Sequence, residues 1–537
     1  MQQFAGPFKA LFLCGYVLNG VQCIARLSGP KLTNYMIDNA LLKQNAGALY
    51  KSVLLFCLLF AISEISRMLQ TSLFVHVQES MTVWLRKNME KAITRCGIYE
   101  LRKIETGDLI HRMAVEIPRI SAFYTKELPA FFTNAFILFF GIVMMWKLNA
   151  RCTIAAGIIL SALYFAVRYF LPQIQHITQQ RTEQSAHFTA IVEEILEHGI
   201  ILKLNQAYQY GDARFEKAAE NLQLETEKLA KHQLIMSAVL TLITLFPNLF
   251  LYLWGGKLVL ARQMTVGTLI ALNAYVGYLI SSVVYFAQSF VRFQQSEVGM
   301  KRYEEILSLC GNNEAIDERR DAIKAVKNFR TLSFQHVSFR YKERLALEDV
   351  SFEIEAGQRV WITGENGAGK TTLAYLMAGL LKPDGGKILF NGKDMQEVGF
   401  YSFNPMICMV TQENHLFEDT AVKNILLGRN ELKDKLPCLF SEWDALGFFD
   451  GSFPKRKINS KGTDISGGQA KKINILRALL KDAPLVIFDE AEAFLDAKAK
   501  EALWRYIGTH PEKTFVLISH EKPANIKFEQ HIFLKPE

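Results

Sequence analysis

The chain has 537 residues, of which 50% are hydrophobic and 21% are charged, and its formal net charge is +8. This net charge is modest for the length and suits contact with anionic lipid headgroups. The basic residues form no stripe in the sequence, so we expect no nucleic-acid partner. The length favours about two to four domains. The eight cysteines are scattered singly without a C-x-x-C pair, which favours buried, reduced thiols over disulfides or a metal site.

Long apolar runs dominate the first half of the chain. Each is about 20 residues long, enough to cross about 30 Å of hydrocarbon as a helix. The six runs are Phe8–Leu27, Ser52–Val75, Leu128–Trp146, Cys152–Leu171, Leu234–Trp254 and Thr268–Ala287. The first run contains Asn19, Gln22 and Arg26 and lacks a clear cleavage site, so we expect a retained span rather than a signal peptide. The runs predict an α-helical membrane domain with six spans.

Two long polar links, His76–Glu127 and Pro172–Gln233, follow the second and fourth spans. Both show helical periodicity. Within Phe188–Ile201, for example, apolar residues recur at spacings of three and four. We therefore expect the spans to continue beyond the bilayer as long helical extensions.

Several polar residues interrupt the spans. Glu64 and Arg67 stand three apart on one helical face, and they either pair with each other or contact the substrate. Further polar residues either line a cavity or make contacts between helices or with lipid. They are Asn134, Asn248, Asn273, Tyr252, Tyr275 and Tyr278.

A helix-breaking segment near Leu309–Asp321 separates the apolar half from the rest of the chain. The strand candidates Leu332–Tyr341 and Val350–Ile354 follow it. We therefore expect a transmembrane domain over residues 1–309 and a second, α/β domain over residues 310–537.

A glycine-rich loop follows the strand candidate Arg359–Thr363 and opens the helix candidate Thr371–Leu381. It fits the pattern G-x-x-x-x-G-K-[ST], whose backbone N–H groups cradle nucleotide phosphates at a helix N-terminus. In this pattern Lys370 reaches the outer phosphates and Thr371 holds a magnesium ion. The predicted nucleotide-binding residues are Gly364, Glu365, Asn366, Gly367, Ala368, Gly369, Lys370, Thr371 and Thr372.

Further short motifs flank this loop. In chain order they are Phe339-Arg340-Tyr341, Val410-Thr411-Gln412-Glu413, Ile465-Ser466-Gly467-Gly468-Gln469, Leu485–Phe488 with Asp489-Glu490, Ala493-Phe494-Leu495-Asp496, and Ser519-His520. One motif alone is a weak signal, but the ordered set is specific. Together with the six spans and two long links, it resembles the ATP-binding cassette (ABC) exporter half-transporters over nearly the whole chain. The resemblance implies an α/β P-loop nucleotide-binding domain that uses ATP and Mg²⁺.

The resemblance also implies catalytic and binding roles. Tyr341 corresponds to the aromatic residue that stacks on adenine, and Gln412 to the Q-loop glutamine that contacts the metal or γ-phosphate. Asp489, at the end of an apolar strand, can orient the magnesium ion, and Glu490 can polarise the attacking water as general base. His520 can hydrogen-bond the γ-phosphate. The implied catalytic set is Glu490, His520 and Gln412, and the implied metal ligands are Thr371, Gln412 and Asp489.

The signature motif implies a dimer. Its residues Ser466, Gly467, Gly468 and Gln469 open the helix candidate Gly468–Leu480, and a helix N-terminus is an anion site. In the family this helix faces the ATP of the other subunit. The resemblance therefore implies a second half-transporter as partner, with a homodimer favoured and a heterodimer possible.

The order of the domains implies an orientation. The nucleotide domain follows the sixth span and ATP is cytosolic, so we expect the long links and both termini in the cytoplasm. Charge bias adds little, because the links carry about as many acids as bases. The resemblance implies an integral, multi-pass protein of the bacterial plasma (inner) membrane. The turns near His111–Glu116 and Leu204–Asp212 are expected to contact the nucleotide domains.

Three segments depart from the family pattern. The helix after the signature, Gln469–Ala478 with Lys471 and Lys472, stands where the family usually has a Gln-Arg pair and an Ala-Arg-Ala, Glu492-Ala493 replaces a Thr-Ser pair, and Ser460 replaces a glutamate before the signature. These changes affect coupling between subunits but remove no catalytic group, so we expect hydrolysis.

The resemblance does not identify the transported substrate. Seven residues precede the first span, which disfavours exporters that cleave peptide leaders. A lipid, a hydrophobic drug and a small peptide all remain as transported substrates. The alternative function is a regulatory half of a heterodimer that only clamps its nucleotide.

Overall fold

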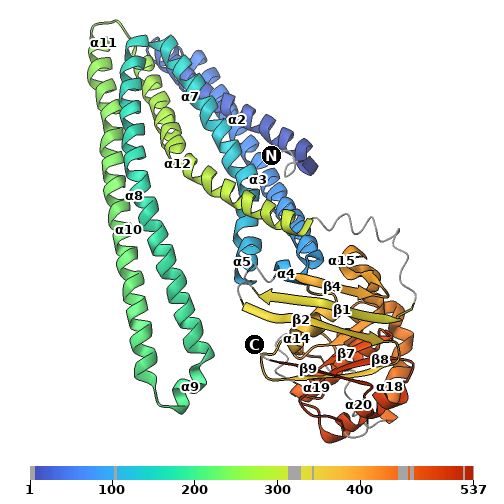
Figure 1. Ribbon diagram of the computed structural model, residues 1–537. Helices are drawn as coiled ribbons and strands as arrows, with labels where there is room; N and C mark the ends of the chain where they lie inside the picture. The colour runs from blue at the N-terminus through green and yellow to red at the C-terminus, as the bar shows by residue number, and fades with distance from the viewer. Residues whose placement is uncertain are drawn as a thin grey trace. The chain divides into compact units, whose positions relative to one another are not determined.

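The computed structural model describes residues 6–101, 104, 106–311, 328–341, 344–398, 400–445, 457–459, 465–523 and 526–535. The chain forms two compact units (Figure 1). The first comprises Met1–Lys91 and Thr106–Ile306, and the second comprises Ala92–Glu105 and Leu307–Glu537. Most of the predicted boundary segment, and Ser460, lie outside the described residues.

Helices alone build the described part of the first unit, and several of them exceed 40 residues. They are η1 (Gly6–Phe8), α2 (Lys9–Tyr35), η2 (Met36–Leu41), α3 (Ala46–Arg95), α5 (Thr106–His111), η3 (Arg112–Glu116), α6 (Ile117–Ala122), η4 (Phe123–Glu127), α7 (Leu128–Leu148), α8 (Ala150–Glu197), α9 (Gly199–Leu204), α10 (Tyr208–Phe250), η5 (Leu251–Gly255), α11 (Gly256–Leu260) and α12 (Val266–Gly311). Among the described residues, six helical segments are long and apolar enough to cross a membrane, which confirms the six predicted spans.

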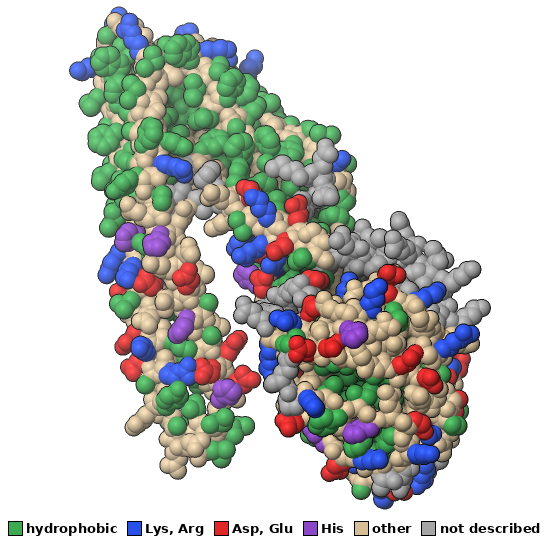
Figure 2. Space-filling model, viewed as in Figure 1, with side chains coloured by type: hydrophobic (Ala, Val, Ile, Leu, Met, Phe, Trp, Pro, Cys, Tyr) green, Lys and Arg blue, Asp and Glu red, His purple; other side chains and the backbone are tan. Residues whose placement is uncertain are grey.

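The predicted helical extensions are also present. Helices α8 and α10 run side by side and are joined by α9 (Figure 1). Arg214 of α10 makes an ion pair of 2.6 Å with Glu194 of α8, and the rings of Phe188 and Phe215 lie 5.4 Å apart. Hydrophobic side chains cover the end of this unit near α11, whereas charged side chains gather along the opposite half of α8 and α10 (Figure 2). This division is what a helix pair that leaves the bilayer requires.

Several polar groups in the spans are satisfied by neighbouring helices. The Asn19 amide donates to the Pro129 carbonyl at 3.3 Å and accepts from the Thr133 hydroxyl at 2.8 Å. The Tyr275 hydroxyl donates to the Leu27 carbonyl at 2.8 Å, so Tyr275 makes a contact between helices. Such bonds hold helices together where lipid offers no polar partner.

The two charged residues of the second span form the local ion pair that the sequence allowed. The Arg67 guanidinium lies 2.6 Å from the Glu64 carboxylate. Asn134 lines a cavity with other polar residues of α2 and α3, in agreement with one of its two predicted roles.

Strands and short helices build the second unit. The strands are β1 (Thr331–Tyr341), β2 (Arg344–Glu355), β3 (Arg359–Gly364), β4 (Gly385–Phe390), β5 (Lys393–Asp394), β6 (Ile407–Val410), β7 (Leu485–Asp489), β8 (Thr514–Ile518) and β9 (Gln530–Leu534). The helices are α4 (Ile98–Leu101), α14 (Lys370–Met377), α15 (Met395–Val398), α16 (Phe400–Phe403), η6 (Asn404–Met406), α17 (Ala421–Leu426), η7 (Asn430–Lys435), α18 (Leu436–Ala445), α19 (Gly467–Leu479) and α20 (Ala497–Thr509).

Two sheets organise these elements. An antiparallel sheet has the order β2-β1-β4-β5, and a parallel sheet has the order β6-β7-β8-β3-β9. Every residue of β7 and β8 is buried, because helices cover a parallel sheet on both faces. The carboxyl ends of parallel strands meet at one edge, where ligands bind in such sheets.

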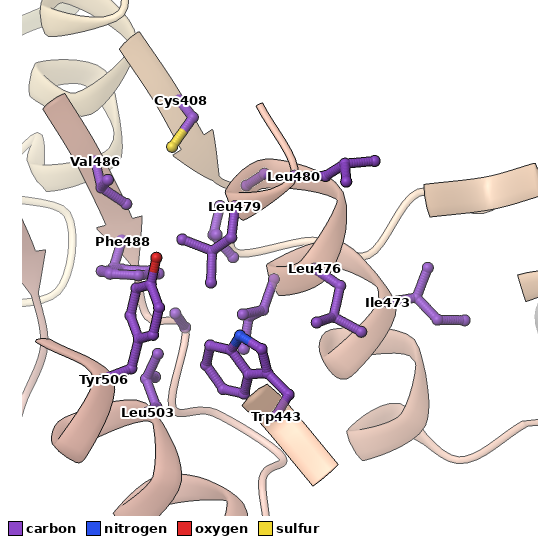
Figure 3. Close-up of a cluster of buried hydrophobic side chains, with 14 of the residues drawn as sticks. Cys408, Trp443, Ile473, Leu476, Leu479, Leu480, Val486, Phe488, Leu503 and Tyr506 are labelled. Carbon is purple, nitrogen blue, oxygen red and sulfur yellow. The ribbon is translucent and has the colours of Figure 1, made fainter. Parts of the chain in front are cut away.

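A hydrophobic core fixes α19 against the parallel sheet. The fully buried Trp443 of α18 lies 5.1 Å, ring to ring, from Tyr506 of α20. Figure 3 shows Trp443 and Tyr506 facing Leu476 of α19 and Phe488 of β7. The second half of α19 and the strand β7 are therefore held by one packed cluster.

One expectation about the cysteines is wrong. Cys96, directly after α3, is disulfide-bonded, whereas the sequence favoured reduced thiols throughout. No local spacing marks this bond, because the fold rather than a motif brings the two sulfur atoms together. The free cysteines among the described residues are Cys14, Cys23, Cys57, Cys152, Cys408 and Cys438.

Candidate nucleotide site

The glycine-rich loop joins β3 to α14, which confirms the predicted strand–loop–helix context. Gly367 and Gly369 have φ angles of +88° and +82°, in the left-handed region that side chains avoid. A Cβ atom at Gly369 would lie 2.4 Å from the Ala346 carbonyl oxygen. The sequence therefore needs glycine here both for backbone conformation and for space.

Lys370 is buried at the start of α14, with 8% of its surface exposed. Its ammonium group donates to the carbonyls of Gly364 at 2.8 Å and Glu365 at 3.1 Å. Both acceptors are backbone carbonyls of the same loop, so these bonds leave its charge unneutralised. The loop thus presents a fixed cation to a phosphate ligand.

Asp489 ends β7 and is 1% exposed. Neither of its carboxylate oxygens has a hydrogen-bond partner within the described part of the chain. Burial raises the pKa of Asp489 to about 6; the charge of Glu490 adds to this rise, and the ammonium groups of Lys471 and Lys370 oppose it. A buried carboxylate without a partner fits a bound cation.

The donor set suits Mg²⁺, which binds one or two protein oxygens together with phosphate and water. The oxygens available are those of Asp489, Thr371 and Gln412. Within the described residues, no group of three or more His, Cys, Asp or Glu side chains could hold a metal ion.

Glu490 connects the residues that follow three adjacent strands, β6, β7 and β8. The Gln412 amide donates to one carboxylate oxygen at 2.8 Å, and Nε2 of His520 lies 3.2 Å from the other. The structure thus brings together the three residues predicted as catalytic. Glu490 has a φ angle of +47°, and its backbone N–H donates to the Ile518 carbonyl at 3.0 Å. Such strain in a residue other than glycine is typical of functional sites.

The signature residues form the start of α19. The Ser466 hydroxyl accepts from the Gln469 N–H at 3.2 Å, and the Gln469 side-chain oxygen accepts from the Ser466 N–H at 3.2 Å. This capping box orients the helix start. A Cβ atom at Gly468 would lie 2.6 Å from the Phe494 carbonyl oxygen, and one at Gly467 would lie 3.5 Å from the Phe494 ring. The glycines therefore let the segment Ala493–Asp496 pack onto the signature motif.

Tyr341 lies apart from the carboxylate cluster, at the end of β1 in the antiparallel sheet. Its ring meets the Phe339 ring edge to face, with 4.9 Å between the centroids. The ring is partly buried against the core below the glycine-rich loop.

Two side chains that the motifs did not single out tie α19 to the Gln412 loop. The Lys471 ammonium donates to the carbonyls of Thr411 at 3.1 Å and Gln412 at 2.9 Å, and the Asn474 amide donates to the Thr411 carbonyl at 3.3 Å. Burial lowers the pKa of Lys471, and the nearby carboxylates, Asp489 first among them, oppose this. The sequence offered one indication of this role: Lys471 and Asn474 are three residues apart, which places both on one face of the helix.

Family models match the chain in two places. The ABC transporter transmembrane region matches residues 12–283, and the ABC transporter domain matches residues 347–493. The chain belongs to the ABC transporter family. This ABC transporter therefore joins a membrane domain to an ATP-binding domain, and it is an ATPase coupled to transport across the membrane.

Known proteins resemble this ABC transporter over most of its length. A putative multidrug export ATP-binding/permease protein of Bacillus subtilis (strain 168) is 24% identical over 511 residues, covering 93% of this chain and 87% of that protein. A multidrug resistance ABC transporter protein of Lactococcus lactis subsp. lactis is 23% identical, with 99% and 90% covered. An ATP-dependent lipid A-core flippase of Desulfotalea psychrophila is 26% identical, with 77% and 73% covered.

A solved structure has the same fold. It is a bacterial Atm1-family ABC exporter with ATP bound, and the match has a TM-score of 0.78 at 22% identity. It covers 98% of this chain and 93% of the other. The match confirms the predicted fold, a six-span helical domain followed by an α/β nucleotide-binding domain.

Proposed function

We propose that this ABC transporter exports a hydrophobic or amphipathic substrate (a lipid, drug or small peptide) by alternating access driven by ATP hydrolysis. The observation that carries the proposal is the intact cluster of Gln412, Glu490 and His520 beside the phosphate loop. The relatives named as multidrug exporters and as a lipid flippase support export and this range of substrates.

In the proposed reaction, Glu490 takes a proton from the attacking water while Gln412 and His520 orient the water and the γ-phosphate. In-line phosphoryl transfer depends mainly on such positioning and on charge stabilisation. Residues 364–372 hold the phosphates, with Lys370 as the cation, and Tyr341 contacts the adenine. Thr371, Asp489 and Gln412 hold Mg²⁺, which neutralises phosphate charge when bound. The unpartnered oxygens of Asp489 support this assignment.

The proposed assembly is a dimer of half-transporters, each with a transmembrane domain over residues 1–309 and a nucleotide domain over residues 310–537. Ser466, Gly467, Gly468 and Gln469 of each chain complete the ATP site of the other. A homodimer is favoured, because no catalytic group is missing. The dimer lies in a bacterial plasma membrane with both termini in the cytoplasm, and the turns near His111–Glu116 and Leu204–Asp212 transmit closure of the nucleotide domains.

The test is the ATPase activity of the purified chain in lipid, screened with amphipathic lipids, drugs and peptides. We expect basal hydrolysis that one substrate class stimulates and that Glu490→Gln abolishes. Transport of the stimulating compound into inside-out vesicles identifies the substrate. No hydrolysis by the chain alone, with activity restored by a different half-transporter, would instead establish the regulatory role.

A further inference from the structure

Lys471 of the signature helix α19 is fully buried, at 0% exposure. Its hydrogen-bond acceptors are the carbonyls of Thr411 and Gln412, at 3.1 and 2.9 Å. Burying a lysine ammonium is costly unless its hydrogen bonds and charge are compensated. The two carbonyls that accept these hydrogen bonds belong to the loop of Gln412, whose side-chain amide donates to the Glu490 carboxylate at 2.8 Å. The chain of contacts therefore runs from the signature helix through Lys471 and Gln412 to Glu490.

Glu492 is the second unusual group near this point. Its Oε2 atom is buried without a hydrogen-bond partner among the described residues. Burial raises the pKa of the Glu492 carboxyl, and the charge of Glu490 adds to this rise, whereas the charges of Lys500 and Lys471 oppose it. Lys471 and Glu492 are thus two ionisable groups with buried atoms near Glu490.

These two residues lie in two of the segments in which the sequence departs from the family pattern. Glu492 adds a carboxylate to the stretch that carries Asp489 and Glu490, and like charges in a poorly solvated site repel. Lys471 is a buried cation whose charge acts on these carboxylates.

We propose that Lys471 is a positioning residue for ATP hydrolysis, which holds the loop of Gln412 through one hydrogen bond to the Thr411 carbonyl and one to the Gln412 carbonyl, while its charge balances the extra carboxylate of Glu492. The inference rests on the proposed function, since it concerns the same ATPase site. It assigns this chain a coupling between the signature helix and the Gln412 loop that depends on a buried ion in addition to the neutral Asn474 side chain.

Mutations distinguish the two parts of the proposal, which are the hydrogen bonds of Lys471 to the Gln412 loop and its charge balance with Glu492. Lys471→Met removes both the hydrogen bonds and the charge, and we expect kcat for ATP to fall about 10- to 100-fold with KM within twofold, since misplacing a catalytic group has that effect. Lys471→Gln keeps a hydrogen-bond donor but loses the charge, so it also lowers kcat. Adding Glu492→Thr removes the unbalanced carboxylate. We expect Lys471→Gln/Glu492→Thr to recover to within about threefold of wild type.

The control variants isolate each contribution. Lys471→Met/Glu492→Thr lacks the donor to the Gln412 loop, so its kcat should stay low. Lys498→Gln makes the same chemical change at an exposed residue of α20 and should leave kcat unchanged. The measurements are kcat, KM and nucleotide affinity of the full chain in lipid. A packing role alone would lower stability without rescue by Glu492→Thr.

The outcomes decide between three accounts. Wild-type turnover by Lys471→Met, or no recovery in Lys471→Gln/Glu492→Thr, overturns the inference while the proposed function stands. If Lys471→Met does not fold, the comparison of Lys471→Gln with its double variant decides alone. Absence of ATPase activity in the wild-type chain with any partner refutes the proposed function and this inference with it.

Discussion

The two units differ in how their best-defined polar groups are paired. In the spans, several polar side chains pair with one another within or between helices: Asn19 bonds with Thr133, and Glu64 pairs with Arg67. In the nucleotide unit, polar groups converge with capacity unused: among the described residues, neither Asp489 carboxylate oxygen has a hydrogen-bond partner, and the Lys370 ammonium donates to two backbone carbonyls. The difference separates a region whose polar groups hold helices together from one whose polar groups await a ligand.

The largest effect should come from the group at the centre of that convergence. Glu490→Gln preserves the size of the side chain and removes the general base. We expect ATP to bind normally and hydrolysis to fall on the order of 10²–10⁴-fold. Single-turnover ATPase assays and nucleotide-binding measurements check both parts. Hydrolysis by the variant at the wild-type rate would remove Glu490 from the mechanism.

A pair of tryptophans tests the packing side of the comparison. Trp443 is fully buried in the nucleotide unit, whereas Trp146 is 55% exposed on the third span. Trp443→Ala should lower the free energy of unfolding of the nucleotide unit by about 3–5 kcal/mol. Denaturant unfolding measures this change. Trp146→Ala is the control and should leave that unit unchanged. Equal destabilisation by both would show that the two units do not unfold separately.

Lys370→Ala tests whether the unused cation of the loop is there for the nucleotide. A hydrogen bond to a charged group contributes about 1.5–3 kcal/mol, so ATP affinity should fall about 10- to 100-fold and transport with it. Isothermal calorimetry with ATP measures the change. The variant Lys382→Ala, on an exposed lysine beyond α14, is the control. Unchanged affinity in Lys370→Ala would contradict the assignment of the loop.

Cysteine reactivity gives the smallest and most local test. Cys408 on β6 is buried, and burial raises the pKa of its thiol to about 12. The thiolate that reacts with alkylating agents would form only near that pH, so native protein at pH 8 should not be labelled at Cys408. Cys438 on α18 is exposed and should react. Labelling of Cys408 at the rate of Cys438 would show that the parallel sheet opens in the native state.

The fold and the placement of the site could be predicted from the sequence wherever a local sequence pattern determines a single helix, strand or loop. The six spans follow from apolar length, and the phosphate loop follows from glycines that β3 and α14 require. Contacts that depend on packing between distant segments were not predictable. The disulfide of Cys96 is one example, and the bond from Lys471 to the Gln412 loop is another, because the two segments lie about 60 residues apart. The capping box of Ser466 and Gln469, by contrast, has a local sequence pattern, Ser-x-x-Gln.

The central claim is that a second chain completes each ATP site. It is tested most directly by a disulfide between Ser466→Cys in one copy and Asn366→Cys in the phosphate loop of another, in chains that carry Glu490→Gln to trap ATP and Cys438→Ser to remove an exposed thiol. The account predicts a crosslinked dimer when ATP is trapped, and no crosslink without nucleotide or with either cysteine alone. Crosslinks that form equally without ATP, or only within single chains, would contradict the dimer and the alternating-access mechanism built on it.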